Sequence, residues 1–150
     1  MNKSHLTAIA RKVQPVPVRW LVEHHRIQFP VLDYGCGKCF SVNPFPWINY
    51  DPHWYKINLD SFRGSFQTVV CTYVMCVLRP KERRAVLRDI QTLLRPEGTA
   101  YITLNKRRPK WGWGEHPRGT YQGRGTNLWL PEVYSNSNFR ILKMMKDDKI

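Results

Sequence analysis

An apolar run that ends in an acid and continues into two closely spaced glycines constrains this 150-residue chain more than any other feature. Residues 31–38 read V-L-D-Y-G-C-G-K, and the next apolar run ends in Tyr50-Asp51. Glycines at the tip of a strand let the backbone approach a ligand, and an acid at the tip of the next strand accepts hydrogen bonds from ribose hydroxyls. The layout therefore predicts a nucleoside-type ligand at the ends of two strands.

The absence of a third glycine disfavours dinucleotide ligands. The dinucleotide fingerprint G-x-G-x-x-G requires glycine at position 40, where the chain has Phe40, so pyrophosphate binding is disfavoured. The segment instead resembles motif I of the class I S-adenosylmethionine (SAM)-dependent methyltransferases. That motif usually has a further glycine where this chain has Cys39, so we expect the loop to be slightly displaced there.

Two later segments extend the resemblance. F-Q-T-V-V-C-T-Y-V-M-C-V-L, from residue 66, resembles motif IV of that family, and L-L-R-P-E-G-T-A-Y-I-T, from residue 93, resembles the turn and strand that follow. The likeness covers roughly residues 28–104. It implies an α/β fold with a Rossmann-like methyltransferase sheet, mostly parallel with a C-terminal antiparallel strand. T-A-I-A-R-K at 7–12 and R-G-T-Y-Q at 118–122 also resemble small phage-type methyltransferases.

The elements are expected to form one domain over residues 1–150, with an N-terminal helical segment at 1–28. Helices are expected at 4–13, 18–27 and 81–94. Strands are expected at 29–34, 47–50, 55–59, 66–71, 99–104, 127–130 and 139–144. Asn43-Pro44-Phe45-Pro46 cannot be regular helix, so the fold is minimal and its first crossover helix is shortened or lost.

Composition restricts the partners and the compartment. No apolar run reaches the ~18 residues of a membrane span, and residues 1–12 lack the apolar stretch of a secretory signal. A cytoplasmic protein is therefore expected. Lys and Arg total 24 against 11 acids, for a net charge of +13, which favours a polyanion such as nucleic acid. Plain solubility is the alternative explanation of that charge.

The resemblance also implies which residues bind SAM. Asp33 would lie near the methionine amino group, Asp51 would accept the ribose hydroxyls, and His53 would lie beside the adenine. The alternative for Asp51 is a turn-forming aspartate before proline. The implied cofactor-binding residues are Asp33, Gly35, Cys36, Gly37, Asp51, Pro52, His53, Leu59, Cys71 and Tyr73.

Residues for the chemistry itself are harder to assign. Tyr73 should lie at the end of the central strand, where open α/β sheets bind ligands, and would either pack on the target or only line the pocket. The Asn/Asp/Ser-Pro-Pro-aromatic motif of amino-methylating enzymes is absent. His53 and His116 are general-base candidates by residue type, although exposed loop histidines are the simpler explanation. We take Tyr73 and His116 as the catalytic candidates.

Residues 105–125 form the expected substrate loop, because a loop of this length in a small domain is usually functional. It interleaves cations, which contact phosphates, with aromatics, which stack on unpaired bases. Trp111 and Trp113 could instead cover the edge of the sheet. The candidate substrate-binding residues are Arg107, Arg108, Trp111, Trp113, Arg118 and Tyr121.

The sequence leaves several functions open beside a nucleic-acid methyltransferase. One is a small-molecule methyltransferase, and another is a non-catalytic module that binds SAM or nucleic acid. A third is a zinc-containing nucleic-acid binder that uses Cys36, Cys39, Cys71 and Cys76, although buried free cysteines explain the last two better and no metal is expected. A homodimer or a partner protein could complete so small a recognition surface.

Overall fold

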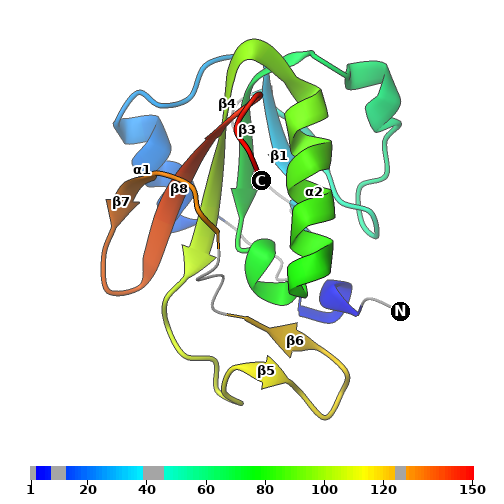
Figure 1. Ribbon diagram of the computed structural model, residues 1–150, viewed down its shortest axis with the longest axis vertical. Helices are drawn as coiled ribbons and strands as arrows, with labels where there is room; N and C mark the ends of the chain where they lie inside the picture. The colour runs from blue at the N-terminus through cyan, green and yellow to red at the C-terminus, as the bar shows by residue number, and fades with distance from the viewer. Residues whose placement is uncertain (1–2, 8–12, 39–45, 124–127) are drawn as a thin grey trace.

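A six-stranded sheet organises the protein, as the computed structural model in Figure 1 shows. The structure describes residues 3–7, 13–38, 46–123 and 128–150. The strand order is β2-β1-β3-β4-β8-β7, and the strands are β1 (Val31–Tyr34), β2 (Ile48–Tyr50), β3 (Phe66–Thr72), β4 (Leu94–Asn105), β7 (Glu132–Ser135) and β8 (Phe139–Met145). Strands β2, β1, β3 and β4 are parallel, and β8 is antiparallel to both of its neighbours. The predicted Rossmann-like, mostly parallel sheet with a C-terminal antiparallel strand is confirmed.

One helix covers each face of the sheet. Helix α2 (Pro80–Leu93) packs Leu87, Ile90 and Leu93 on one face, at the spacing of a single helical stripe. Its start is fixed by Pro80 in the first turn and by Glu82, whose carboxylate accepts the Arg79 N–H at 2.8 Å.

On the other face lies α1 (Val16–Glu23), whose Val18 and Leu21 pack against residues of the central strands. Successive strand residues point to opposite faces, so Val69 and Cys71 face α2 while Val70 faces α1. Among the described residues, no helix is long and apolar enough to cross a membrane.

Three expected elements differ from the structure. Residues 55–59 form no strand: Tyr55 makes one bridge with Asp51, and a 3-10 helix, η2, follows at Leu59–Phe62. Residues 128–130 are not a strand, and the edge strand β7 begins only at Glu132. The 105–125 segment contains a hairpin of β5 (Gly114–Glu115) and β6 (Tyr121–Gln122).

Two expectations fall partly outside the described residues. The helix expected at 4–13 is a 3-10 helix, η1, at Ser4–Thr7, and residues 8–12 are not described. The first crossover includes residues 39–45, which the structure also does not describe. The Cys39 displacement expected in the glycine loop belongs to that segment. The described remainder of the crossover, residues 35–38 and 46–47, contains no helix.

Candidate functional site

The glycine loop that follows β1 folds back onto the end of β2. The N–H groups of Gly35 and Cys36 both donate to the Tyr50 carbonyl, at 2.7 and 3.0 Å. Gly35 has φ +78° and Gly37 has φ +64°, which are backbone conformations that residues with side chains rarely adopt. Residues 35–38 therefore lie against the end of β2 with no side chain at either glycine.

Asp51 holds this loop to the turn that follows β2. Its Oδ2 accepts the Gly37 N–H at 3.0 Å, and its Oδ1 accepts the N–H groups of His53 and Trp54 at 2.8 and 3.1 Å. A carboxylate accepts about four hydrogen bonds, two at each oxygen. Counted over the part of the chain that the structure describes, Oδ1 therefore has its two donors and Oδ2 has one of two. The structure shows the turn-forming role of Asp51, and a ribose contact through Oδ2 stays a proposal.

The backbone turns sharply at Tyr73, directly after β3. Tyr73 has φ +61°, which is rare for a residue with a bulky side chain, and its N–H donates to the Thr103 carbonyl at 3.1 Å. Strict alternation after Cys71 would point Tyr73 toward α2. The turn instead packs Tyr73 with the core on the α1 face and Val74 with the core on the α2 face. Such strain is often found at functional sites.

Val74 connects the tips of β1 and β3. A Cβ placed on Gly35 would overlap Val74 Cγ2, so the glycine loop lies directly against this side chain. We expect Gly35→Ala to unfold at lower temperature, because it adds this overlap to the cost of the left-handed conformation, and to lose measurable affinity for SAM. Thermal melts and calorimetry check both effects.

Gly64 gives a matched control for that substitution. Its φ is +67°, and a Cβ added there would have no atom within 4 Å, so Gly64→Ala carries the backbone cost of about 1 kcal/mol without an overlap. Adding Val74→Ala to Gly35→Ala should recover part of the lost stability. Equal destabilisation by the two glycine substitutions would contradict the close contact between Gly35 and Val74.

Two predicted cofactor residues lie in the core instead. Leu59 is 8% exposed at the start of η2, and Cys71 is fully buried on the α2 face of β3. Neither side chain is exposed at the strand ends, and their assignment as cofactor contacts stays a prediction. Asp33 and Cys36 are partly exposed at the tip of β1, and Pro52 and His53 are exposed after β2.

The N-terminal segment reaches the same edge of the sheet. The rings of His5 in η1 and His53 lie 4.2 Å apart between centroids. A Cβ on Gly119, in the turn of the β5–β6 hairpin, would lie 3.2 Å from Lys3 Nζ. Residues 3–7 thus connect the turn after β2 to the hairpin. No sequence signal indicates the contact between His5 and His53.

The hairpin is fastened beside the strained turn at Tyr73. The Gly123 N–H donates to the Cys76 carbonyl at 2.7 Å, within the 3-10 helix η3 (Met75–Val77) that follows β3. Arg79 forms an ion pair with Glu115 at 2.8 Å and lies 5.9 Å from the Tyr121 ring centroid. The expected substrate loop is therefore held at the carboxyl edge of the sheet.

The predicted substrate residues differ in exposure. Trp111 is 71% exposed, so it does not cover the sheet edge as the alternative required. Its ring lies 5.2 Å from Lys110 Nζ and 5.2 Å from the His116 ring centroid. Arg107, Arg108 and Arg118 are exposed, whereas Trp113 and Tyr121 are half-buried.

His116 has a structural role in the hairpin turn. Its Nδ1 accepts the Arg118 N–H at 3.2 Å, which places the proton of the neutral ring on Nε2, and its own N–H donates to the Thr120 carbonyl at 2.8 Å. Taking up a proton at Nδ1 would break the first of these bonds. This geometry disfavours His116 as a general base.

The buried cysteines are held as thiols. Burial raises the pKa of both Cys71 and Cys76, and Cys76 Sγ accepts the Asn105 N–H at 3.1 Å. Cys39 lies outside the described residues, and among the described ones no group of three or more His, Cys, Asp or Glu side chains could hold a metal ion.

A raised pKa leaves less reactive thiolate at neutral pH. We therefore expect Cys71 and Cys76 to remain unmodified by iodoacetamide at pH 7.5 in the folded protein and to react fully in guanidinium. Peptide mass spectrometry before and after denaturation reads each site. Rapid labelling of either cysteine in the native protein would contradict its burial.

Comparison with solved structures agrees with this architecture: the fold is that of the Rossmann-like class I methyltransferases. The 1,6-didemethyltoxoflavin-N1-methyltransferase of Burkholderia thailandensis, solved with 1,6-didemethyltoxoflavin and S-adenosylhomocysteine, is 14% identical over 95% of this chain and 77% of its own, with a TM-score of 0.56. The PH0226 protein of Pyrococcus horikoshii OT3 is 12% identical over 84% of this chain and 85% of its own, with a TM-score of 0.54. No protein-family model and no curated protein matches the sequence.

Proposed function

We propose that this protein is a SAM-dependent methyltransferase that methylates a nucleic acid. The observation that carries the proposal is the geometry of the glycine loop. The Gly37 N–H donates a hydrogen bond to the Asp51 carboxylate, and this joins the ends of β1 and β2. In open α/β sheets, ligands bind at this edge, where neighbouring strands end and their loops diverge. The methyltransferase fold of the sheet agrees with SAM as that ligand.

The residues at this edge fit the cofactor. The loop carries no side chain at Gly35 or Gly37, and Asp51 Oδ2 accepts one hydrogen bond from the described residues, which leaves capacity for a hydroxyl donor. SAM supplies a methyl group on a sulfonium, so the protein has to bind it, orient the target and keep water away. Asp33 and Asp51 would hold the cofactor, and Tyr73 would line the place where the target enters.

A nucleic-acid target is favoured by the hairpin and by the net charge. The exposed Arg107, Arg108 and Trp111 lie just before this hairpin, and the exposed Arg118 lies in its turn. The hairpin itself is held next to Tyr73. Cations and aromatics in this arrangement fit phosphates and unpaired bases. The short segments at 7–12 and 118–122 support a relation to small phage-type methyltransferases. The chain would act as a homodimer or with a partner protein, in the cytoplasm.

A small heteroaromatic molecule is the second candidate substrate. The Burkholderia enzyme of similar fold is named for methylation of 1,6-didemethyltoxoflavin, which is such a molecule. A substrate of this size would need neither the charge of +13 nor an exposed tryptophan beside arginines. Salt dependence separates the candidates, because only a polyanion releases many counterions on binding.

Calorimetric titration with SAM and S-adenosylhomocysteine is the first test, and we expect saturable binding of either at micromolar concentration. Transfer of labelled methyl from SAM is then measured on RNA, single-stranded DNA, duplex DNA, protein and small-molecule fractions. Label in a nucleic-acid fraction supports the proposal, and label only in small molecules supports the second candidate. No SAM binding would reject methyl transfer and leave a binding module.

A further inference from the structure

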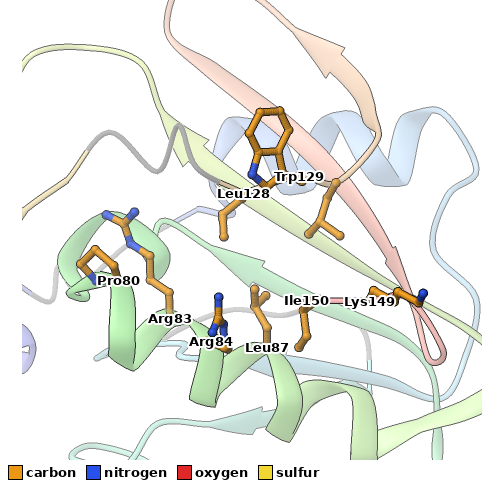
Figure 2. A pocket seen from close by; sticks show the side chains of 9 residues that line it. Pro80, Arg83, Arg84, Leu87, Leu128, Trp129, Lys149 and Ile150 are labelled. Carbon is orange, nitrogen blue, oxygen red and sulfur yellow. The ribbon is translucent and has the colours of Figure 1, made fainter.

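A cavity lies between α2, residues 128–130 and the last residues of the chain (Figure 2). Its volume is about 140 Å³. A cavity of ~150 Å³ accepts a ring the size of benzene, whereas typical small-molecule sites measure ~300–1,000 Å³. The space therefore suits one ring or one side chain. It is lined by Pro80, Arg83, Arg84, Leu87, Leu128, Trp129, Leu130, Lys149 and Ile150.

The cavity combines an apolar interior with a cationic rim. Leu87 and Leu130 are buried in its wall, and Figure 2 shows the Leu128 side chain pointing toward α2. Arg84 and Lys149 are exposed at the opening. An anionic ligand with a planar or apolar group would match both parts.

Trp129 makes the opening unusual. Its side chain is 93% exposed, the highest value among the exposed large apolar residues of the described chain. An indole in water exposes a large apolar face and is characteristic of binding surfaces. Trp129 therefore offers an exposed stacking surface at a cavity that Arg84 and Lys149 also line.

Three exposed cations follow one side of α2, and one of them, Arg84, lines the cavity. Lys81, Arg84 and Arg88 are spaced three and four residues apart, so they share one side of the helix, and all are exposed. The acids of this helix are engaged elsewhere. Glu82 accepts the Arg79 N–H, and Asp89 accepts the Tyr34 hydroxyl at 2.8 Å and forms an ion pair with Arg63. The helix surface is thus positive, with its acids bonded to other groups.

We infer that this surface binds single-stranded nucleic acid, with a base stacked on Trp129 or seated in the cavity and phosphates on Arg84, Arg88 and Lys149. Stacking requires unpaired bases, and the positive row follows a phosphate backbone. An acidic polypeptide would satisfy the cations but would leave the exposed indole unexplained. The inference does not depend on methyl transfer and concerns a surface outside the proposed cofactor site.

The position of the cavity connects it to the hairpin. A Cβ on Gly123, directly after β6, would overlap the guanidinium of Arg83, which lines the cavity. Arg83 is itself buried, and its Nε donates to the carbonyls of Met75 and Leu78 at 2.8 and 2.9 Å. A single-stranded nucleic acid that contacts the hairpin can therefore continue past Arg83 to Trp129.

The test is fluorescence anisotropy with a labelled 20-nucleotide oligothymidine, its duplex with oligoadenine, and polyglutamate as competitor. We expect Trp129→Ala to weaken single-strand binding by about 5- to 150-fold, in line with the loss of one stacked base, and to change duplex binding little. Trp129→Phe should restore most of the affinity. The double variant Arg84→Glu/Lys149→Glu should bind more weakly and show a smaller salt slope.

The control for charge is Arg19→Glu/Arg26→Glu, which makes the same change at exposed positions in and just after α1, the helix on the opposite face of the sheet. The inference is overturned if this control weakens binding as much as Arg84→Glu/Lys149→Glu, or if Trp129→Ala binds the single strand normally. Competition by polyglutamate at the same charge concentration would overturn it in favour of an acidic protein partner.

SAM titration keeps this inference separate from the proposed function. The Trp129→Ala variant should bind SAM like the unmodified protein, because the residues that line the cavity include none of the proposed cofactor residues. Single-strand binding that depends on Trp129, in a protein that does not bind SAM, would reject the methyltransferase and retain this surface. SAM binding together with single-strand binding that does not depend on Trp129 would retain the methyltransferase and reject this surface.

Discussion

Asp51→Asn is expected to remove most of the affinity for SAM while the protein remains folded. The asparagine oxygen can still accept the N–H groups of His53 and Trp54, so the turn after β2 is preserved. Its amide NH₂ would face the Gly37 N–H, which places donor against donor and abolishes the free acceptor at Oδ2. Loss of a hydrogen bond to a charged group corresponds to about 10- to 150-fold in affinity.

Asp51→Ala should act on both affinity and stability. It removes the carboxylate that accepts three backbone N–H groups, and the residue is only 9% exposed. We therefore expect about 2–4 kcal/mol of destabilisation in addition to the loss of SAM binding. Calorimetry measures affinity, and urea unfolding measures stability. Asp60→Ala is the control, because the Asp60 side chain is 81% exposed and should affect neither. Unchanged SAM affinity in Asp51→Asn would refute the cofactor site.

The centre of the sheet was predictable because its strands there are apolar runs. The runs around Val69, Ile102 and Leu142 are buried on both faces, which gives a strong signal that hardly depends on context. The glycine loop was equally visible, since a positive φ selects for glycine at positions 35 and 37. Helix α2 was clear from its apolar stripe and from Pro80 in its first turn.

The errors arose where the decisive interactions are not local. The edge strand β7 has mixed burial and no apolar run, whereas the apolar L-W-L at 128–130 predicts a strand although Leu128 contributes to a cavity wall. Strands β5 and β6 have two residues each, which is too short for any periodicity. The burial of Leu59 and Cys71 was likewise not visible from their positions near the strand ends, because it depends on which way each side chain points.

The site needed the structure for a different reason. The sequence offered Asp51 as either a ribose ligand or a turn former, and only the three N–H contacts show how much of its hydrogen-bonding capacity the turn consumes. His116 likewise resembles a base by residue type, but its Nδ1 is bonded within its own turn. The contact between His5 and His53 joins segments 48 residues apart, so it leaves no pattern in the sequence.

Tyr73→Gly is expected to lower methyl transfer strongly while it relaxes the backbone. Glycine adopts φ +61° without the cost of about 1–2 kcal/mol that other residues incur there, and it would keep Val74 against the glycine loop. It also removes the ring at the end of β3, where the target is proposed to enter. Loss of positioning at a reacting centre costs on the order of 100-fold in rate.

Tyr73→Ala and Tyr73→Phe separate strain from the role of the ring. Alanine lacks the ring and retains the backbone cost, so Tyr73→Ala should be less stable than Tyr73→Gly by about 1 kcal/mol, the reverse of the usual order of these residues. Phenylalanine keeps the ring, so Tyr73→Phe should retain most activity unless the hydroxyl takes part.

His25 provides the control for strain alone. It also has a positive φ, +54°, and it is exposed just after α1, so His25→Gly should gain stability without a change in methyl transfer. Urea unfolding and transfer of labelled methyl to the accepted nucleic acid give the two readouts. Full activity in Tyr73→Gly would show that the ring only fills space, whereas activity lost in Tyr73→Gly and Tyr73→Ala but kept in Tyr73→Phe would place the aromatic ring against the target. The strained turn would then serve to bring that ring, and not Val74, to the α1 side of the strand end.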